Sequence, residues 1–509
     1  MNILPAQMIR EADAVTMRTE PIADIDLMER AARACFNWIR ERHPSGVPFA
    51  VFCGPGNNGG DGLAVARMLI AAGYRVATRV LSAPDGMSPS CRVNYDRLLA
   101  AAGNDGYLIP QQVTDAGSLA CPDPGCVILD AIFGNGLTRP PAGLPAEVIR
   151  FINGSGLPVI AIDLPSGLYC DTSTNATGGP VVRAGHTLTF APPKLALFFA
   201  ENAPCTGTWH LLPIGLDEVF IGSAPVQNHM LTAGELRPLL RERGKFSHKG
   251  HFGHTLLLAG STGKMGAAIL ASRACLRAGT GLLSARVPAG GNSILQTAVP
   301  EAMTLPDESD GCLSGIPDLG PYTAIAAGPG MGTSALAAAA LKVLIQEAAV
   351  PVVFDADAIN ILAENKTWLG FLPQGSVFTP HPKEFERLAG KSGDDFERNQ
   401  RQRDFSVRNQ CHVILKGAHT AITTPGGHCY FNTTGNPGMA TGGSGDVLTG
   451  MLAGLLAQGY PVTEACLLGV YLHGLAGDLA LATESRESLV AGDIIQHIGK
   501  AFQQLYGKF

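Results

Sequence analysis

Short apolar runs alternate with helical patterns along the whole chain. The runs lie at residues 48–53, 126–133, 158–164, 186–190 and 208–212, and again at 254–260, 282–287, 323–327, 351–355, 376–379 and 411–416. Apolar runs of this length that are followed by glycine or polar residues are typical of buried parallel strands. Helical periodicity between them, for example at residues 63–72, predicts an α/β protein. The six later runs fit a second sheet of their own.

Helices and a linker are also visible in the pattern. Residues 1–45 predict two helices, and the second carries one apolar stripe made of Leu27, Met28, Ala31, Ala32, Cys35, Trp38 and Ile39. Asp24 or Asp26 is placed to cap it. Residues 217–250 are mixed and polar, which predicts a linker that leads into a second domain.

The sequence NPGMATGGSGDVLTG at residues 436–450 combines small residues, one carboxylate and a helix start. A helix is predicted from about Asp446, because apolar residues then recur on one helical face. The free N–H groups of such a start bind anions, and the helix dipole favours the ionised form of Asp446. Gly442, Gly443 and Gly445 allow a ligand to approach the backbone. This pattern suits a kinase-like site in which Asp446 takes a proton from a hydroxyl. The alternative is an ordinary glycine-rich turn with an aspartate cap.

A second glycine-rich segment, GPGNNGGDG at residues 54–62, joins a predicted strand to a predicted helix. Open α/β sheets bind phosphates with this geometry, although the spacing matches neither the dinucleotide fingerprint nor the P-loop. Two other strands end in Asp130 and Asp163, and Ser166 follows the second. Strand ends share one crevice, so these oxygens together with those of Asn57, Asn58 and Asp61 suit a hard cation rather than zinc. Alternatively, the two aspartates cap loops.

Composition narrows the class of protein. The chain has 509 residues, 46% hydrophobic and 16% charged, which predicts two to four domains with large cores. A net charge of −6 without a basic run gives no reason to expect nucleic acid or a membrane as partner. The 12 cysteines include no CxxC pair, which argues against a zinc site or a disulfide framework. With no secretory signal or bilayer-spanning run, a soluble cytoplasmic protein is predicted.

The motifs of the first half resemble a known family. PGNNGGDG, LDAIFGNGLTRP and IDLPSGL resemble the epimerase domain of the NAD(P)H-hydrate repair enzymes, over residues 1–220. The resemblance implies a Rossmann-like three-layer domain that interconverts R- and S-NAD(P)HX, with Asp163 as substrate contact and candidate for proton transfer. It also implies a potassium site made of Asn58, Asp130 and Ser166. The implied substrate contacts are Asn57, Asn58, Gly59, Gly60, Asp61, Gly134, Asn135, Gly136, Leu137, Thr138, Arg139, Pro140 and Asp163. Eukaryotic members carry a lysine in the second motif, where this chain has only Arg139, so the partner of Asp163 is open.

The second half resembles the dehydratase domain of the same family, over residues 225–509. The motifs are GSTGKMGAA, AAGPGMG, DADAIN, TPHPKEF, LKGAHT and TGGSGDVLTG. They imply a ribokinase-like fold and dehydration of S-NAD(P)HX to NAD(P)H, driven by ADP, which becomes AMP and phosphate, or by ATP. Asp446 is then the catalytic base, and Mg²⁺ bridges the phosphates. The implied hydrate contacts are Ala267, Gly330, His381 and Asp446, and the implied nucleotide contacts are Lys416, Gly417, Ala418, His419, Thr420 and Gly445.

Several of these residues also have a purely structural interpretation. Lys416 suits a phosphate partner but equally ends a strand in solvent, and His381 suits an orienting contact but equally lies in a surface loop. Asp355 and Asp357 hold magnesium through water or stabilise a loop. The rival function is a ribokinase-like small-molecule kinase with a non-catalytic N-terminal nucleotide-binding module. The resemblance favours ADP over ATP and a homo-oligomer as the assembly.

Overall fold

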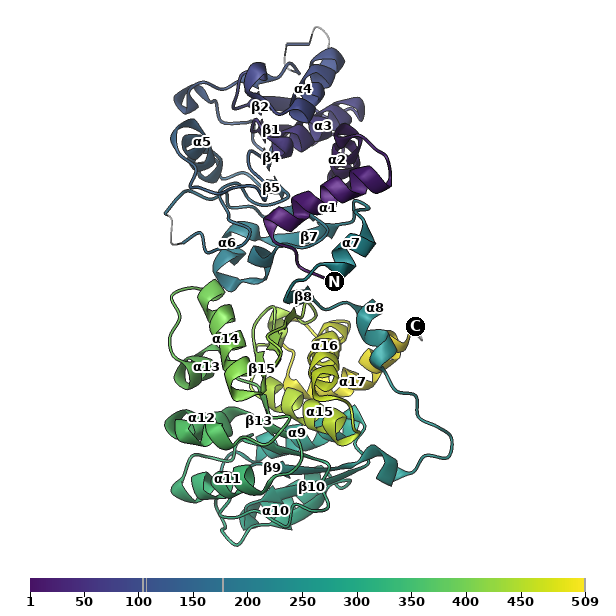
Figure 1. Cartoon of the computed structure of the whole chain (residues 1–509), viewed down its shortest axis with the longest axis vertical. Coiled ribbons are helices and arrows are strands. Elements are labelled where there is room, and N and C mark those ends of the chain that lie inside the picture. The colour runs from purple at the N-terminus through teal and green to yellow at the C-terminus, as the bar shows by residue number, and fades with distance from the viewer. Residues whose placement is uncertain (103–104, 107, 176–177, 508–509) are drawn as a thin grey trace. The chain divides into compact units, whose positions relative to one another are not determined.

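The computed structural model describes residues 1–102, 105–106, 108–175 and 178–507 (Figure 1). Contacts between Cα atoms divide the chain into two compact units. One consists of Asn2–Val226 with Asp394–Phe396 and is called the N-terminal unit. The other consists of Met1, Gln227–Gly393 and Glu397–Phe509 and is called the C-terminal unit. Within the described residues, no helix is both long enough and apolar enough to span a membrane.

A parallel sheet forms the centre of the N-terminal unit. Its strands within the described residues are β1 (Phe49–Cys53), β2 (Val76–Val80), β3 (Gln111–Gln112), β4 (Val127–Ala131), β5 (Val159–Ile162), β6 (His186–Phe190) and β7 (Thr208–Leu212). They are ordered β3-β2-β1-β4-β5-β6-β7, and every neighbouring pair is parallel. This is the order of doubly wound dinucleotide-binding sheets, in which the strand order reverses between β1 and β4. Ligands bind in the crevice at such a reversal.

Helices cover both faces of this sheet. The helices of the unit are α1 (Ala6–Thr19), α2 (Asp24–Arg42), α3 (Asn57–Ala71), α4 (Pro89–Ala102), α5 (Gly143–Gly154), α6 (Ala203–Thr206) and α7 (Glu218–Ser223). Phe49, Val51 and Cys53 of β1 pack with α2, α3 and α4, whereas Ala50 and Phe52 pack with α5. Alternate side chains of a strand point to opposite faces, so both faces of β1 are buried. The predicted three-layer Rossmann-like arrangement is confirmed.

The C-terminal unit contains a larger sheet. Its strands within the described residues are β8 (Asn228–Met230), β9 (His254–Leu258), β10 (Leu282–Val287), β11 (Met303–Pro306), β12 (Ala324–Ala327), β13 (Val352–Phe354), β14 (Val377–Phe378), β15 (His412–Leu415), β16 (Ala421–Thr423) and β17 (Cys429–Phe431). The order is β11-β10-β9-β12-β13-β14-β15-β16-β17-β8. The six strands predicted from the later apolar runs all belong to it. They pair in parallel, while β16 is antiparallel to both of its neighbours.

The helices of this unit also form two layers. They are α8 (Ala233–Leu236), α9 (Met265–Ala278), α10 (Asn292–Ala298), α11 (Ala335–Glu347), α12 (Ala356–Glu364), α13 (Pro382–Ala389), α14 (Asp395–Asn409), α15 (Ser444–Ala457), α16 (Val462–Ala480) and α17 (Ala491–Tyr506). Leu257 and Ala326 of the sheet pack with α9, α15, α16 and α17. Leu256 and Ile325 point to the other face and pack with α11, α12 and α13. The predicted second α/β domain is confirmed.

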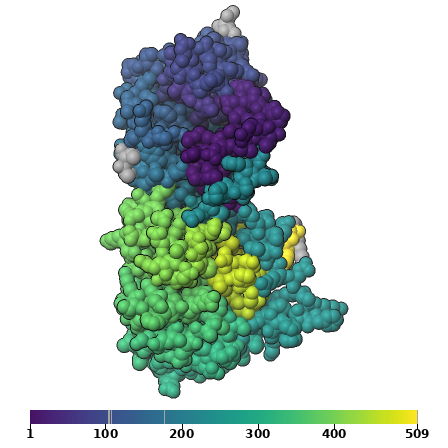
Figure 2. Space-filling model, viewed as in Figure 1, coloured from purple at the N-terminus to yellow at the C-terminus, as the bar shows by residue number. Residues whose placement is uncertain are grey.

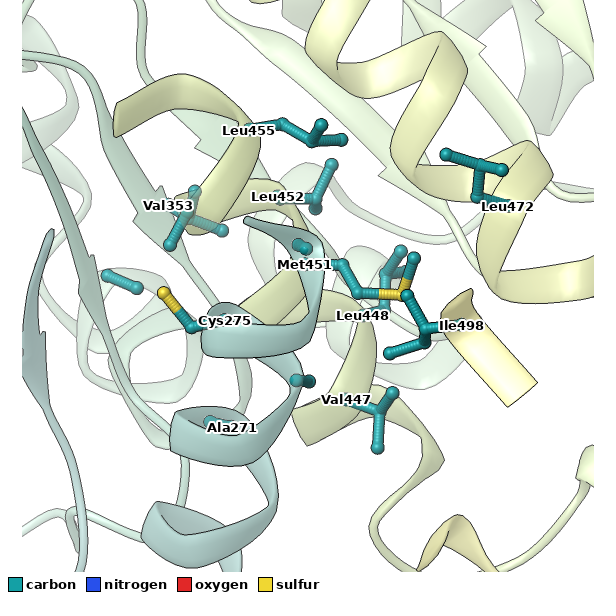
Figure 3. Close-up of a cluster of buried hydrophobic side chains, with 14 of the residues drawn as sticks. Ala271, Cys275, Val353, Val447, Leu448, Met451, Leu452, Leu455, Leu472 and Ile498 are labelled. Carbon is teal, nitrogen blue, oxygen red and sulfur yellow. The ribbon is translucent and has the colours of Figure 1, made fainter. Parts of the chain in front are cut away.

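Two helices at the centre of the unit pack through small residues. A Cβ atom on Gly450 of α15 would lie 2.1 Å from the carbonyl oxygen of Ala271, and one on Gly454 would lie 2.6 Å from that of Cys275. Figure 3 shows Ala271 and Cys275 of α9 beside Met451 of α15. Because glycine lets the helix backbones approach so closely, α9 fixes the direction of α15 and therefore the position of its first turn.

Both glycine-rich segments are more helical than predicted. α3 begins at Asn57 rather than at Leu63, and α15 begins at Ser444 rather than at Asp446. A Cβ atom on Gly62 would lie 2.5 Å from Cβ of Ala131, which shows why this turn of α3 needs glycine. The glycines of residues 54–62 thus serve close packing between helix and strand as well as an open turn.

The predicted linker at residues 217–250 is wrong over its first part. That part forms α7, then β8, which pairs with β17 at the edge of the second sheet, and then α8. β8 is only three residues long and carries His229 rather than an apolar run, so its pairing gives little signal in the sequence. The exposed connection is residues 241–250, the teal segment at the surface in Figure 2.

Candidate active sites

A cavity of about 530 Å³ lies at the point where the strand order of the first sheet reverses, between β1 and β4. The loops after β1 and β4 form one wall, and α1 and α2 form another. Its lining residues are Ile9, Arg10, Asp13, Asp24, Leu27, Met28, Ala31, Pro55, Gly56, Asn57, Asn58, Asp61, Ile132, Phe133, Gly134, Asn135, Gly136, Leu137, Thr138, Arg139, Asp163, Phe190, Ala191, Lys194, Ile214 and Leu216. The lining combines an apolar body with a few convergent charged groups, which is typical of small-molecule sites.

Asp163 and Lys194 form a buried ion pair in this cavity. Nζ of Lys194 lies 2.7 Å from Oδ1 of Asp163, and the side chains are only 1% and 8% exposed. Nζ also donates a hydrogen bond to the carbonyl oxygen of Phe190 at 2.7 Å. The other carboxylate oxygen, Oδ2, accepts a hydrogen bond from the backbone N–H of Asn135 at 2.9 Å. Each oxygen of the Asp163 carboxylate thus has one partner, and the bond to Phe190 fixes the position of Lys194.

The backbone of Asp163 is strained. Its φ angle is +65°, in the left-handed region that residues with a side chain seldom adopt. The Asp163 N–H donates a hydrogen bond to Leu188 of β6, which holds this conformation. Strain of this kind persists at functional sites, where the surrounding structure fixes a side chain in a required direction. Here it turns the carboxylate into the cavity instead of along β5.

Lys194 is the positively charged partner of Asp163 that the sequence analysis left open. The sequence motifs offered only Arg139, which lines the cavity but forms no ion pair within the described residues. Lys194 lies 31 residues after Asp163 in a segment without a glycine-rich motif. One signal was available, since Lys194 is the only lysine in residues 1–226.

Two further carboxyl groups of the cavity resist ionisation. Burial, and then the negative charge of Asp163, raises the pKa of Asp61 well above its usual value. Burial likewise raises the pKa of Asp13 to about 6, although Lys194 opposes this shift. One lysine therefore faces several carboxyl groups, and burial favours the protonated form of two of them.

Asn58 is a buried polar residue of this cavity whose side chain lacks hydrogen-bond partners among the described residues. Both its side-chain oxygen and its side-chain nitrogen are buried and make no hydrogen bond within the described residues. A Cβ atom on Gly134 would lie 2.8 Å from Oδ2 of Asp163 and 3.3 Å from Cγ of Asn58, so the two side chains flank Gly134. An orphaned buried amide beside a carboxylate indicates that a ligand completes the site.

Asp130 and Ser166 lie directly behind the cavity wall. The Ser166 hydroxyl donates to Oδ1 of Asp130 at 2.6 Å, and its N–H donates to Oδ2 at 2.7 Å. Phe133 N–H donates to the Ser166 hydroxyl at 2.8 Å. Asp130 is fully buried, and burial raises the pKa of its carboxyl to about 6. The pair clamps the loop after β4, and with the oxygen of Asn58 its oxygens have the chemistry that suits a hard cation.

A second cavity, of about 600 Å³, lies beside the first turn of α15 in the C-terminal unit. Its lining residues are His381, Lys416, Gly417, Ala418, Thr420, Asn432, Thr434, Gly435, Asn436, Pro437, Met439, Ala440, Ser444, Gly445, Leu448, Val470, His473 and Gly474. His473 was not expected from the sequence. Its Nε2 donates to the carbonyl oxygen of Ser444 at 3.0 Å, which anchors the first residue of α15.

Lys416 extends from the end of β15 toward the start of α15. Its Nζ lies 2.9 Å from Oδ1 of Asp355, and Thr449 donates to Oδ2 of the same carboxylate at 2.7 Å. Burial alone would lower the pKa of Lys416, but the ion pair with Asp355 outweighs burial and raises it. A Cβ atom on Gly445 would lie 3.2 Å from Nζ, so glycine keeps the ammonium beside the helix start. Lys416 is therefore a fixed positive charge, and Asp355 positions it.

Asp446 lies in the first turn of α15 with no hydrogen bond or ion pair within the described residues. Burial, followed by the negative charge of Asp355, raises the pKa of its carboxyl to about 7. The helix dipole favours the ionised form of Asp446, but burial and a neighbouring carboxylate outweigh it, so the pKa lies above the usual carboxyl value. A carboxyl that titrates near the working pH suits a general base.

His381 is the N-cap of α13. Its Nδ1 accepts hydrogen bonds from the N–H groups of Lys383 at 3.1 Å and Glu384 at 3.3 Å. These contacts require an unprotonated Nδ1, and burial lowers the pKa of the ring. The ring also lines the second cavity, on the same side as Lys416. His381 is thus a capping residue at the mouth of the site and not a free loop histidine.

The remaining predicted residues lie where the strand order of the second sheet reverses, between β9 and β12. A Cβ atom on Gly330 would lie 3.1 Å from Cβ of Ala267 and 2.8 Å from the carbonyl oxygen of Lys264, so these segments touch. Lys264 pairs with Asp357 at 3.2 Å, and Gly332 N–H donates to the same oxygen at 2.9 Å. Gly330 and Ala267 line this edge of the sheet rather than the cavity beside Lys416.

Comparison with known proteins places the chain. A family model described as YjeF-related protein N-terminus matches residues 24–196, and one described as NAD(P)H-hydrate dehydratase matches residues 255–500. A bifunctional NAD(P)H-hydrate repair enzyme of Moorella thermoacetica is 37% identical over 99% of this chain and 97% of its own length. The chain belongs to the bifunctional NAD(P)H-hydrate repair enzymes. A further family member, from Escherichia coli, is 31% identical over 92% of this chain and 88% of its own.

A solved structure matches one half of this repair enzyme. The ADP/ATP-dependent NAD(P)H-hydrate dehydratase of Bacillus subtilis, co-crystallised with ATP and Mg²⁺, is 31% identical and covers 54% of this chain and 98% of its own. Its TM-score against the whole chain is 0.48.

The structure brings most of the predicted repair-enzyme residues into the two cavities. Of the predicted epimerase contacts, Gly59, Gly60 and Pro140 do not line the first cavity. The two glycines are instead in close packing contacts within the fold. Of the predicted nucleotide contacts, His419 does not line the second. The described residues hold no cluster of three or more His, Cys, Asp or Glu side chains arranged for a metal ion.

Proposed function

We propose that this repair enzyme epimerises R- and S-NAD(P)HX in residues 1–220 and dehydrates S-NAD(P)HX to NAD(P)H in residues 225–509. The observation that carries the proposal is the presence of two separate acid–base centres. Asp163 with Lys194 lies in the cavity of the N-terminal unit, and Asp446 with Lys416 lies at the helix start of the C-terminal unit.

The epimerase chemistry follows from the substrate. The C6 hydroxyl of the hydrate is bonded to a carbon next to the ring nitrogen, so the nitrogen electron pair assists its loss. A carboxyl group protonates the hydroxyl, the C6–O bond breaks, and water leaves a planar C6. Water then adds to the opposite face and gives up a proton to a carboxylate. Asp163 is placed to accept that proton, and Lys194 stabilises its negative charge before the transfer.

Potassium belongs to the epimerase site in this proposal. Asn58, Asp130 and Ser166 would hold the ion, and the buried amide of Asn58 without a partner supports the fit. The ion supplies positive charge that favours the ionised form of Asp130, whose burial otherwise raises its pKa. Asn58 and the loop after β4 would then orient the hydrated ring against Asp163.

Dehydration requires a better leaving group than hydroxide. Asp446 would take the proton of the C6 hydroxyl while that oxygen attacks the terminal phosphoryl group of ADP, which leaves AMP. The N–H groups at the start of α15 and the Lys416 ammonium stabilise the charge on the phosphoryl oxygens. Phosphate then departs from C6, and C5 loses a proton to give NAD(P)H. Asp357, one of the two aspartates considered for magnesium, would hold Mg²⁺ together with the phosphates, and the ion would neutralise phosphate charge.

We assign the second cavity to the adenine nucleotide and the edge beside Ala267 and Gly330 to the hydrate. Asp446 lies in the first turn of α15, between the two. ADP is the proposed donor, and a cytoplasmic homo-oligomer is the proposed form of the protein. The alternative function, a small-molecule kinase with a non-catalytic N-terminal module, does not explain the buried ion pair of Asp163 and Lys194.

Product analysis tests the proposal. The enzyme is incubated with racemic hydrate of NADH, K⁺, Mg²⁺ and ADP. A repair enzyme releases one phosphate for each NADH formed and consumes both epimers. A kinase would leave a stable phosphate ester and no NADH, which would overturn the proposal. A second incubation with ATP in place of ADP identifies the preferred donor.

A further inference from the structure

We infer that Asp13 of α1 is a second acid–base residue of the epimerase site and exchanges a proton with the C6 hydroxyl of the hydrate. This inference rests on the proposed epimerase function and names a residue that lies outside the glycine-rich motifs. Asp13 lines the same cavity as Asp163, Lys194 and Asn58.

The position of Asp13 is set by the packing of α1. Ile9 and Ala12 are buried, and the hydroxyl of Thr16 accepts a hydrogen bond from Asp217 N–H at 2.8 Å, which fixes the C-terminal half of the helix. Ile9, Arg10 and Asp13 all line the cavity, as expected for residues on one helical face. The helix therefore presents Asp13 to the substrate from a wall other than the one that carries Asp163.

The Asp13 carboxyl has no structural partner in the fold, within the described residues. It makes no hydrogen bond or ion pair within the described residues, although it is largely shielded from solvent. By contrast, Asp24 in the same cavity is bound by the Ser90 hydroxyl. A shielded carboxyl without a structural partner, aimed into a substrate cavity, is suited to contact the substrate.

Burial favours the protonated form of Asp13 and raises its pKa to about 6. The positive charge of Lys194 opposes this shift, and the negative charges of Asp163 and Asp24 add to it. Asp61, Arg10 and Arg139 are the other charged or titratable residues that line the cavity. Asp163, in contrast, is paired with Lys194. The two carboxyl groups thus differ in their partners, since Lys194 contacts Asp163 and no side chain of the described residues pairs with Asp13.

The proton balance is complete with these two residues. In one direction, Asp13 gives a proton to the C6 hydroxyl, the C6–O bond breaks with its electron pair on the departing water, and the ring nitrogen forms a double bond to C6. Water adds from the other face, the double-bond pair returns to nitrogen, and Asp163 takes the proton of the new hydroxyl. The reverse epimerisation uses the same groups in exchanged roles, so no oxidant or other reactant is required.

The test compares Asp13→Asn, Asp13→Glu and the matched control Glu11→Gln, which changes an exposed carboxylate on the same helix. Exchange between purified epimers is followed by chromatography over a range of pH, without ADP. We expect Asp13→Asn to lower kcat by about 100-fold or more with little change in KM, as for loss of a general acid. Asp13→Glu restores part of the rate, and Glu11→Gln leaves it unchanged.

The pH profile separates a chemical role from a structural one. In the wild-type enzyme the exchange rate falls as the pH rises through about 6, because Asp13 loses its proton, and this limb disappears in Asp13→Asn. Circular dichroism and urea unfolding report on folding of the N-terminal unit, and dehydration of the S epimer stays at the wild-type rate in each variant. Exchange by Asp13→Asn within threefold of the wild type overturns the inference. Absence of exchange in the wild type overturns the epimerase proposal itself. If Asp13→Asn does not fold, Asp13→Ser decides, since it also lacks a carboxyl group, and an unchanged pH limb and rate in that variant contradict the inference.

Discussion

Nζ of Lys194 lies 2.7 Å from Oδ1 of Asp163, and the protein shields both side chains almost completely from solvent. A buried ion pair is a weak source of stability, because removing two charges from water costs several kcal/mol that their attraction barely repays. An apolar pair of similar size would serve the fold as well. The pair, together with the strained backbone of Asp163, is therefore best explained by the chemistry of the cavity.

Replacing Lys194 by methionine leaves the Asp163 carboxylate buried and without its partner. We expect epimer exchange to be lost and the N-terminal unit to be destabilised by about 3–5 kcal/mol. Epimer exchange and urea unfolding of the purified variant measure the two effects.

The double variant Lys194→Met with Asp163→Asn is the matched control. It removes both charges, so most of the lost stability returns while epimer exchange stays absent. Full exchange activity in Lys194→Met would show that the ion pair has no part in the reaction.

Asn58→Ala removes a buried amide that has no partner within the described residues. We expect epimer exchange to fall and its dependence on potassium to weaken, while the dehydration rate stays unchanged. Exchange is measured in potassium and in lithium chloride of equal ionic strength. An exchange rate equal to that of the wild type in both salts would remove Asn58 from the site.

The dehydration rate depends on the ionised form of Asp446. Because burial and Asp355 raise the pKa of this carboxyl to about 7, the rate should fall about tenfold per pH unit below that value. Asp446→Asn should abolish dehydration and leave epimer exchange intact. A dehydration rate that changes by about tenfold or less between pH 5 and pH 8 would contradict the role of Asp446 as base.

The same carboxyl has a predictable effect on stability. Its pKa is higher in the folded protein than in the unfolded chain, so its contribution is fully present at low pH and is lost as the pH rises through about 7. At pH values above that, Asp446→Asn should be more stable than the wild type by about 2–4 kcal/mol. Hydrogen exchange of peptides from α15 measures the difference, which should vanish toward pH 4, close to the ordinary carboxyl pKa of about 3.9.

Gly450→Ala tests the close packing of α9 and α15. The added Cβ would lie 2.1 Å from the carbonyl oxygen of Ala271, so the helices must separate at a cost of about 1–3 kcal/mol or more. Gly499→Ala on α17, where a Cβ meets nothing within 4 Å, is the control and should stabilise its helix. Dehydration should suffer only in Gly450→Ala. Equal thermal stability of the two variants would be inconsistent with this packing.

Much of the architecture is visible in the sequence because the strands are buried on both faces. Parallel strands such as β1 and β9 then appear as continuous apolar runs, and the glycine-rich segments mark where each sheet reverses. β8 escapes prediction, since a short edge strand with a histidine has no such run. The start of α3 also escapes, because its first turns are built from glycines whose role is close packing and not helix propensity.

The candidate sites divide in the same way. Residues in glycine-rich motifs, such as Asn58 and Asp446, are recognisable because backbone geometry ties them to a local pattern. Lys194 and Asp13 reach the cavity from segments distant in sequence, so only the fold brings them to Asp163. The raised pKa of Asp446 could not be predicted for a related reason, since burial and the charge of Asp355 are tertiary effects.

The central claim is that one chain carries both activities, and recovery of NADH from a racemic hydrate tests it most directly. The wild-type enzyme, Asp163→Asn and Asp446→Asn are each incubated with limiting racemic hydrate, ADP, K⁺ and Mg²⁺, and the absorbance of NADH is followed to its end point. The account predicts complete recovery by the wild type, recovery that halts when the S epimer is exhausted in Asp163→Asn, and none in Asp446→Asn. Complete recovery by Asp163→Asn at the wild-type rate, or NADH formation by Asp446→Asn, would contradict it.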